Sequence, residues 1–359
     1  MMANTRVVQL RKLLEKQGLE AVLITGEVNR RYLTGFTGSS GYVLITGHKA
    51  YLITDFRYMV QAAHQAVGFE IVEHAANVID TVKQLLNDNK IDKLAFEQDH
   101  VVYATFRTYE EELAPVKLQP VSGLVEELRM FKDDQELALM KQAADLADQT
   151  FMHMLTVLKP GVTELEMALE MEIFMRKNGA ASSSFDTIVA SGERSALPHG
   201  VASERVIGNN EFVKMDFGAL MMNGYCSDIT RTVVMGEPTA KHREIYNIVL
   251  EAQLYALDHL RPGMTGREAD ALCRDIISRY GYGDQFGHST GHGLGMEVHE
   301  APRLSKLSDT ILQPGMVVTV EPGIYIPGFG GVRIEDDVVI TETGMRRLTE
   351  SSKELKMIK

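Results

Sequence analysis

The stretch HSTGHGLGMEVHE, residues 288–300, contains three histidines and three glycines. Glycines on both sides of His292 leave space around its imidazole and allow a close approach of the backbone. A lone histidine between glycines is usually a loop residue, so its role depends on the segments around it. Four acidic residues stand in strand-like segments on either side of this stretch, and they decide how the second half of the chain is interpreted.

These acidic residues are Asp216 in VKMDFG, Asp228 in CSDITRT, Glu321 in VTVEPGIY and Glu335 in GVRIEDD. Burying an unpaired carboxylate in a strand lowers the stability of the folded protein by several kcal/mol, on the order of the loss measured when a buried charge loses its partner. A metal ion removes that cost. Four carboxylates and the imidazole of His292 suit a pair of divalent ions such as Mn²⁺, Co²⁺ or Zn²⁺. The sequence therefore predicts a metal centre with two ions.

Asp216 and Asp228 lie on the two strands of one predicted hairpin. Because side chains alternate between the faces of a strand, the length of the turn decides whether the two carboxylates share a face. A two-residue turn at Asn223-Gly224 would place the two carboxylates on opposite faces of the sheet. A three-residue loop over 222–224, with Gly224 left-handed, pairs Asp216 with Thr230 and brings Asp228 diagonally beside Asp216. A shared metal site therefore requires the longer loop.

The second half of the chain repeats one pattern. The segments KPGVTELE (159–166) and RPGMTGRE (261–268) are 102 residues apart, and each predicts the start of a helix with a capping box. Longer helices over about 133–158 and from about 241 precede them. The strands that hold Asp216 and Glu321 follow at an offset of 105 residues. We interpret this as an internal duplication of two helix–helix–hairpin halves related by a pseudo-twofold axis.

The first third of the chain alternates strand-like and helix-like segments, which predicts an α/β domain. The predicted strands are 21–25, 42–46, 51–54 and 94–96, and the predicted helices are 7–16 and 78–87. Prolines and a glycine between 115 and 123 interrupt the pattern. We predict an N-terminal α/β domain over residues 1–125 and an α+β domain over residues 126–359.

The composition excludes several classes of function. The 359 residues carry 37 basic and 49 acidic side chains, a net charge of −12, which disfavours nucleic-acid binding. Two cysteines exclude a disulfide framework and a cysteine-rich zinc site. No signal peptide and no run of 18 apolar residues is found, so we expect no membrane span and a cytoplasmic protein.

The His288–Glu300 stretch, with DFG, SDITRT, VEPGIY and RIEDD, resembles the pita-bread metallopeptidases, and most closely the Xaa-Pro peptidases, aminopeptidase P and prolidase. The resemblance is close from about Phe131 onward. It is looser in the first domain, through GFTGSSG (35–41) and YLITDFRYMVQA (51–62). It implies a creatinase-like N-terminal domain, a pita-bread catalytic domain, hydrolysis of the bond before proline in Xaa-Pro peptides, and a homodimer.

The resemblance also implies a role for each site residue. Two ions per subunit, expected to be Mn²⁺ with Co²⁺ or Zn²⁺ as alternatives, would be held by Asp216, Asp228, His292, Glu321 and Glu335. Asp228 and Glu335 would bridge the ions, Asp216 would chelate one, and His292 and Glu321 would bind the other. Substrate would contact His199 (in LPHG), His288, His299 and Arg333. Catalysis would use Glu321 as general base, His299 as oxyanion donor and His199 beside the substrate.

Three questions stay open at this point. A methionine aminopeptidase would share the five ligands, but the N-terminal domain and the EPGIY segment argue against it. A non-catalytic pita-bread binding protein is disfavoured because every ligand is present. The metal site does not distinguish a dipeptidase from an aminopeptidase: TDFRY (54–58) favours the aminopeptidase, and the short chain favours the dipeptidase.

Overall fold

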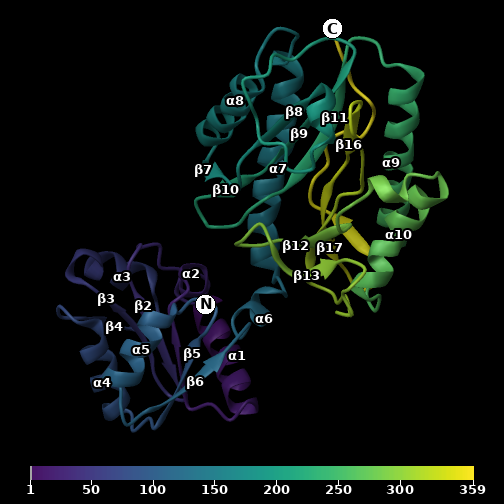
Figure 1. Cartoon of the computed structure of the whole chain (residues 1–359). Coiled ribbons are helices and arrows are strands. Elements are labelled where there is room, and N and C mark those ends of the chain that lie inside the picture. Colours follow the sequence, from purple (N-terminus) through teal and green to yellow (C-terminus); the bar gives the residue numbers. More distant parts are fainter. Residues whose placement is uncertain (1) are drawn as a thin grey trace. The chain divides into compact units, whose positions relative to one another are not determined.

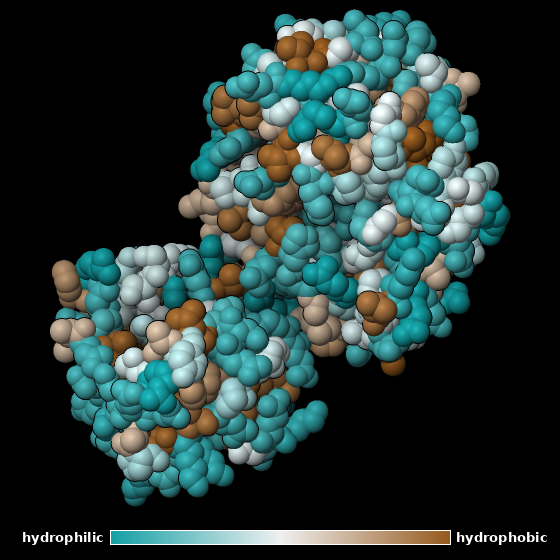
Figure 2. All heavy atoms as spheres, viewed as in Figure 1, coloured by the Kyte–Doolittle hydropathy of each residue, from teal (hydrophilic) through white to brown (hydrophobic). Residues whose placement is uncertain are grey.

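The structure is a computed structural model that describes residues 2–359, with side chains from residue 5 onward. The chain forms two compact units, Met1–Arg129 and Met130–Lys359 (Figure 1). Over the part of the chain that the structure describes, no helix is both long and apolar enough to cross a membrane. On the face shown in Figure 2, both units are mostly hydrophilic, with hydrophobic side chains scattered among the hydrophilic ones.

The first unit is built around a six-stranded mixed sheet in the order β4-β3-β2-β1-β5-β6. Its strands are β1 Ala21–Ile24, β2 Tyr42–Thr46, β3 Ala50–Thr54, β4 Glu70–Glu73, β5 Lys93–Glu97 and β6 Lys117–Val121. Its helices are α1 Met2–Lys16, α2 Glu27–Thr34, α3 Met59–Gln65, α4 Val78–Asp88, α5 Tyr103–Glu112 and α6 Glu126–Arg129. The predicted α/β organisation is confirmed, although the sequence did not predict α2, α3, α5, α6, β4 or β6, and β6 lies within 115–123, where an interruption was expected.

The second unit repeats one arrangement of helices and strands. Its helices are α7 Asp134–Val157, α8 Glu164–Lys177, α9 Ala240–His259 and α10 Gly266–Arg279. Asp133, Thr163 and Thr265 each cap a helix in a capping box, with Glu136, Glu166 and Glu268 as the reciprocal partners. The two capping boxes predicted from the repeated segments are thereby confirmed.

The strands of this unit form two larger sheets and two small ribbons. The larger sheets have the orders β19-β11-β9-β8 and β13-β12-β14-β17-β18, and the ribbons are β10-β7 and β15-β16. The strands are β7 Ala180–Ser183, β8 Ile188–Ser191, β9 Glu211–Phe217, β10 Ala219–Met221, β11 Ile229–Met235, β12 Gly291–Gly293, β13 Glu300–Leu304, β14 Val317–Val320, β15 Gly323–Ile326, β16 Gly330–Arg333, β17 Asp336–Ile340, β18 Met345–Arg347 and β19 Met357–Ile358.

Each helix pair packs against its own sheet. One core joins α7 and α8 to β8, β9 and β11, through side chains such as Met171 and Val213. A second core joins α9 and α10 to β14 and β17, through side chains such as Val249 and Val318. Figure 1 shows the strands of this unit between α8 on one side and α9 with α10 on the other.

The register of the central hairpins follows the duplication. Asp216 on β9 pairs with Thr230 on β11, as the three-residue loop predicts, and Gly224 has a φ of +94°. In the other half, Val320 on β14 pairs with Asp336 on β17. If that pairing is continued by one residue, Glu321 lies opposite Glu335. Glu321 and Glu335 stand 105 residues after Asp216 and Thr230, so the two pairs occupy equivalent positions in the duplicated halves. The hairpin register predicted from parity is therefore confirmed.

Candidate metal centre

A pocket of about 470 Å³ lies where the two hairpins meet. Its wall contains every side chain that the sequence predicted for the site: His199, Asp216, Asp228, His288, His292, His299, Glu321, Arg333 and Glu335. Phe185, Ile188, Pro198, Val201 and Val298 supply its apolar part, and Arg303 is a further charged lining residue. The structure thus brings together residues that stand up to 136 positions apart in the chain, from His199 to Glu335.

Local structure places each acidic side chain at the pocket. Asp216 lies in β9, Asp228 immediately precedes β11, Glu321 immediately follows β14, and Glu335 stands between β16 and β17. His292 is the central residue of β12. The glycines beside it are required by packing, because a Cβ on Gly291 would lie 1.9 Å from the Thr319 carbonyl oxygen.

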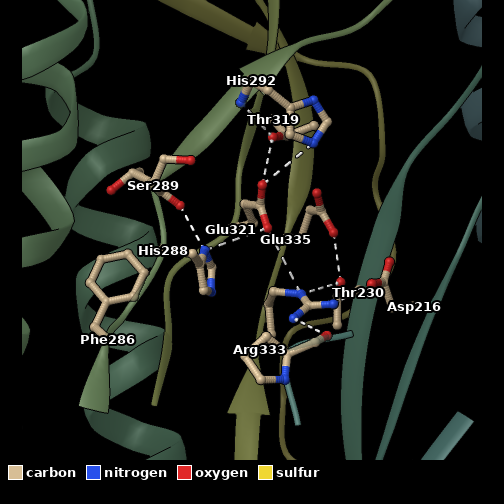
Figure 3. A network of polar contacts seen from close by, with 12 residues as sticks. Asp216, Thr230, Phe286, His288, Ser289, His292, Thr319, Glu321, Arg333 and Glu335 are labelled. Carbon is tan, nitrogen blue, oxygen red and sulfur yellow. Dashed lines mark hydrogen bonds and ion pairs between the residues drawn. The ribbon is translucent and has the colours of Figure 1, made fainter. Parts of the chain in front are cut away.

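One side of the pocket has the geometry of a metal site. Ligand atoms of Asp228, His292 and Glu335 all lie within 4.8 Å of one another. His292 Nε2 is 3.6 Å from Asp228 Oδ2 and 3.5 Å from Glu321 Oε1. Figure 3 shows the carboxylates of Glu321 and Glu335 between the imidazole of His292 and the guanidinium of Arg333.

Arg333 organises the opposite side. Its guanidinium makes an ion pair with Asp216, and its Nε lies 3.9 Å from Glu321 Oε2. The same Nε donates to Thr230 Oγ1 at 2.9 Å, and Thr230 Oγ1 in turn donates to Glu335 Oε2 at 2.6 Å. Thr230 therefore orients two charged groups of the site at once.

The three histidines outside the ligand cluster have different environments. His288 Nε2 is hydrogen-bonded to Tyr325 Oη at 2.8 Å, and its Nδ1 lies 4.0 Å from Glu321 Oε2. The ring of His299 meets that of His292 edge-on, with 4.4 Å between centroids. His199 is exposed at the end of the loop that follows β8. Burial lowers the pKa of His288 to about 3 and that of His292 to about 4, so both rings are neutral. Both nitrogens of His288 are occupied, since Nδ1 donates to the Ser289 carbonyl oxygen at 2.8 Å, whereas His292 Nδ1 donates to the Gly293 carbonyl oxygen at 3.1 Å and leaves Nε2 free to accept a metal.

The carboxyl groups resist ionisation in this setting. Burial and the neighbouring Glu335 carboxylate raise the pKa of Asp228 well above its ordinary value. Burial, followed by Glu321 and Asp216, does the same to the pKa of Glu335. Burial raises the pKa of Glu321 to about 8 against the opposing charge of Arg333. Burial is the main cause of these shifts and neighbouring like charges add to it, and cations among the oxygens would reverse them.

The donor set fits divalent ions. Asp228 Oδ1 is buried and makes no hydrogen bond within residues 2–359, which leaves a carboxylate oxygen available for a ligand. Carboxylate oxygens together with one imidazole nitrogen match Mn²⁺, Co²⁺ and Zn²⁺. The residues present therefore meet the requirement that a buried cluster of carboxylates be neutralised by metal.

A second group of potential ligands lies in the first unit, where Glu97, His100 and Glu126 approach one another. Glu97 Oε2 already accepts from the backbone amides of Thr25 and Gly26 at 2.6 and 2.7 Å. Its Oε1 accepts from Asn29 Nδ2 at 2.7 Å. Because these donors satisfy the buried carboxylate, we interpret the group as structural.

Sequence reasoning did not assign a role to Thr230, Tyr325 or Arg303. Parity had placed Thr230 opposite Asp216, which was a usable signal. Tyr325 Oη accepts from Arg333 Nη1 at 2.7 Å. This contact joins β15 to β16, and no local sequence pattern predicts it. Arg303 pairs across the β12–β13 ladder with His292 and lines the pocket.

Comparison with known proteins agrees with this arrangement. A model of metallopeptidase family M24 matches residues 138–342, and a model of the creatinase/prolidase N-terminal domain matches residues 6–131. An Xaa-Pro dipeptidase from Pyrococcus furiosus is 41% identical over 352 residues, covering 98% of this chain and 99% of its own.

Two solved structures extend the comparison. The Xaa-Pro dipeptidase from Bacillus anthracis has a TM-score of 0.97 and 55% identity, with 99% of each chain covered. The X-Pro aminopeptidase from Thermotoga maritima has a TM-score of 0.92 and 41% identity, covering 97% of this chain and all of its own. These similarities extend over both units.

Proposed function

Because the chain belongs to metallopeptidase family M24 and carries a creatinase/prolidase N-terminal domain, we propose that it hydrolyses the peptide bond before proline, releasing the N-terminal residue of Xaa-Pro dipeptides or Xaa-Pro-containing peptides. The observation that carries the proposal is the gathering of Asp216, Asp228, His292, Glu321 and Glu335 in one pocket, in a chain similar to Xaa-Pro dipeptidases along its whole length. The catalytic domain expected over residues 126–359 contains all of these side chains.

We assign two divalent ions to this pocket. Asp228 and Glu335 would hold both ions, Asp216 would hold one of them, and His292 with Glu321 would hold the other. Bound divalent ions supply Lewis acidity: they polarise a carbonyl oxygen and make water more acidic near neutral pH. Thr230 and Arg333 hold the carboxylates in place around them.

The chain's own side chains would handle the proton and the developing charge. Glu321, between His292 and Arg333, is the general base that takes a proton from water and returns it to the departing proline nitrogen. His299, edge-on to His292, donates a hydrogen bond to the oxygen on which negative charge develops. His199 and His288 border the residue after the scissile bond.

The apolar part of the pocket suits proline. An Xaa-Pro bond is a tertiary amide without an N–H, and the proline ring fixes the φ angle of that residue. Ile188, Pro198 and Val201 offer apolar surface without requiring a donor from the substrate.

Arg303 favours the dipeptide as substrate. Its guanidinium is exposed at the pocket, and among the described residues no carboxylate pairs with it within 4.0 Å. A dipeptide presents its own carboxylate one residue beyond the scissile bond, where an Arg makes a strong charge-assisted partner. Ala-Pro should therefore be hydrolysed faster than its C-terminal amide, and Arg303→Met should remove that difference while leaving hydrolysis of the amide intact.

We further propose that the physiological metal is Mn²⁺ and that the protein works as a cytoplasmic homodimer. Cys226 and Cys273 are both buried free thiols, which fits a reducing compartment. The dimer rests on the family resemblance, and light scattering of the purified protein would test it.

A peptide panel tests the proposal. Ala-Pro, Ala-Pro-Ala, Ala-Ala-Ala and Met-Ala-Ser would be assayed with Mn²⁺, Co²⁺ and Zn²⁺. We expect cleavage of the proline peptides and little cleavage of the other two. Equal cleavage of Met-Ala-Ser would favour a methionine aminopeptidase, and no cleavage together with no bound metal would favour a binding protein.

A further inference from the structure

Lys214 is a fully buried lysine in β9, two residues before Asp216. Side chains alternate along a strand, so Lys214 and Asp216 project from the same face of the sheet, toward the pocket. Within the described part of the chain, no carboxylate forms an ion pair with its ammonium group at 4.0 Å or less. A buried ammonium without such a partner must be satisfied by other acceptors.

Three acceptors surround it. Lys214 Nζ donates to the carbonyl oxygen of Leu197 at 2.5 Å and to that of Pro198 at 3.2 Å. It also lies 5.1 Å from the ring centroid of Tyr325, within the range of a cation–π contact. Burial and the neighbouring charge of Arg333 lower the pKa of Lys214 well below its ordinary value, and the two carbonyl hydrogen bonds hold the amino group in place.

Both carbonyls belong to the segment that leads directly to His199. The Pro198 oxygen also accepts from Arg333 Nη1 at 3.2 Å, and the Leu197 oxygen also accepts from the backbone amide of Gly200 at 3.2 Å. Two side-chain donors, Lys214 and Arg333, therefore converge on the backbone next to His199. His199 itself is exposed, so its position depends on how firmly this backbone is held.

The base of the same loop is fixed separately. The buried carboxylate of Glu164 accepts from the backbone amides of Ser191 at 2.7 Å and Ser203 at 3.1 Å, the two ends of the loop. Glu164 thus closes the loop at its base, and Lys214 holds its tip. The loop would remain attached without Lys214, but its tip would lose an anchor.

We propose that Lys214 is a positioning residue, whose ammonium group fixes the Leu197–Pro198 backbone so that His199 and the Pro198 ring form a rigid wall where the substrate proline lies. The part that concerns substrate rests on the proposed function, in which His199 borders the residue after the scissile bond. A displacement of about 1 Å at such a wall can cost up to about a hundredfold in rate.

The anchoring is tested first without any substrate. Hydrogen exchange of a peptide covering 192–206 would be compared between wild type and Lys214→Met, which keeps the length of the side chain and removes its donors. We expect the amides of Gly200 and Val201 to exchange about tenfold faster in the variant. Lys353→Met is the matched control, because it removes the half-buried amino group of another lysine of the same unit, one that contacts Asp336.

Kinetics then tests the consequence. With Ala-Pro as substrate, Lys214→Met should raise KM about tenfold with a smaller effect on kcat, because the wall contacts the bound substrate and not the reacting atoms. The ratio of kcat/KM for Ala-Pro over Ala-Ala should fall. Lys353→Met should lose stability without changing that ratio. If Lys214→Met does not fold, Lys214→Gln, which keeps a shorter amide donor, replaces it in both measurements.

The outcomes separate the two proposals. Exchange in 192–206 that stays at the wild-type rate would overturn the anchoring, and faster exchange with an unchanged KM would overturn the positioning of His199. A wild-type enzyme that does not cleave Ala-Pro would overturn the proposed function, while the exchange measurement would still decide whether Lys214 holds the loop.

Discussion

Replacing Thr230 with Val tests how the site holds its ligands. The substitution keeps the shape of the side chain and removes one hydroxyl, which is fully buried. That hydroxyl donates to Glu335 Oε2 at 2.6 Å and accepts from Arg333 Nε at 2.9 Å. The variant therefore leaves a buried carboxylate without its donor and a buried guanidinium without one of its acceptors.

The size of the effect follows from these two contacts. A hydrogen bond to an ionised group contributes about 1.5–3 kcal/mol. At about 1.4 kcal/mol for each tenfold change in affinity, loss of the donor to Glu335 should weaken metal binding about 10- to 100-fold. Partners that orient metal ligands usually contribute an effect of this order.

Competition with a chelating dye would measure the affinity, and urea unfolding would measure stability. Thr232→Val is the matched control: its hydroxyl is also buried on β11, but it is hydrogen-bonded to the backbone of Arg333 at 3.0 and 3.2 Å and not to a carboxylate. We expect Thr232→Val to lose stability while keeping metal affinity. Equal metal affinity in wild type and Thr230→Val would refute the reasoning.

Three further predictions follow from the same geometry. His299→Ala should keep its metal and its fold but lose about 10²–10³ in kcat, the usual effect of one oxyanion donor; a raised KM with normal kcat would reassign His299 to substrate binding. Gly224→Val should cost about 1–3 kcal/mol of stability and weaken metal binding, since the φ of +94° resists a β-branched side chain, whereas Gly179→Val, also at positive φ, should cost stability alone. Burial lowers the pKa of His242 below its ordinary value of 6.5, so near that pH the unfolded chain binds a proton that the folded chain does not. The free energy of unfolding should therefore fall as the pH drops through 6.5. A His242→Gln variant whose stability has the same pH dependence as the wild type would contradict this.

Much of the second unit was predictable because short-range signals determine it. Thr163 and Thr265 mark helix starts through residues three positions away, and Gly224 sets the hairpin register through its own backbone conformation. The family resemblance supplied the pita-bread class, which is confirmed. In the first unit, α2 was not predicted: its start at Gly26 has no side-chain cap, and the helix is only eight residues long and mostly polar.

The parts that escaped prediction depend on contacts between distant segments. Thr230 reaches Glu335 across 105 residues, and Arg333 reaches Asp216 across 117. In the sequence, Lys214 resembles any lysine in a strand, and only the structure shows that its side chain donates to the backbone of residues 197–198. No pattern along the chain encodes these pairings, because they arise from the packing of one hairpin against the other. The sequence predicted which side chains would bind metal, and the structure shows which neighbouring side chains contact them.

The most direct test is a metal titration of the metal-free protein, with Ala-Pro hydrolysis followed at each addition of Mn²⁺. We expect no turnover without metal, a rise in turnover until two equivalents of Mn²⁺ per chain are bound, and a plateau beyond. Glu335→Ala should bind less metal and stay inactive throughout. Full turnover in the metal-free protein, or full activity of Glu335→Ala, would contradict the dinuclear site.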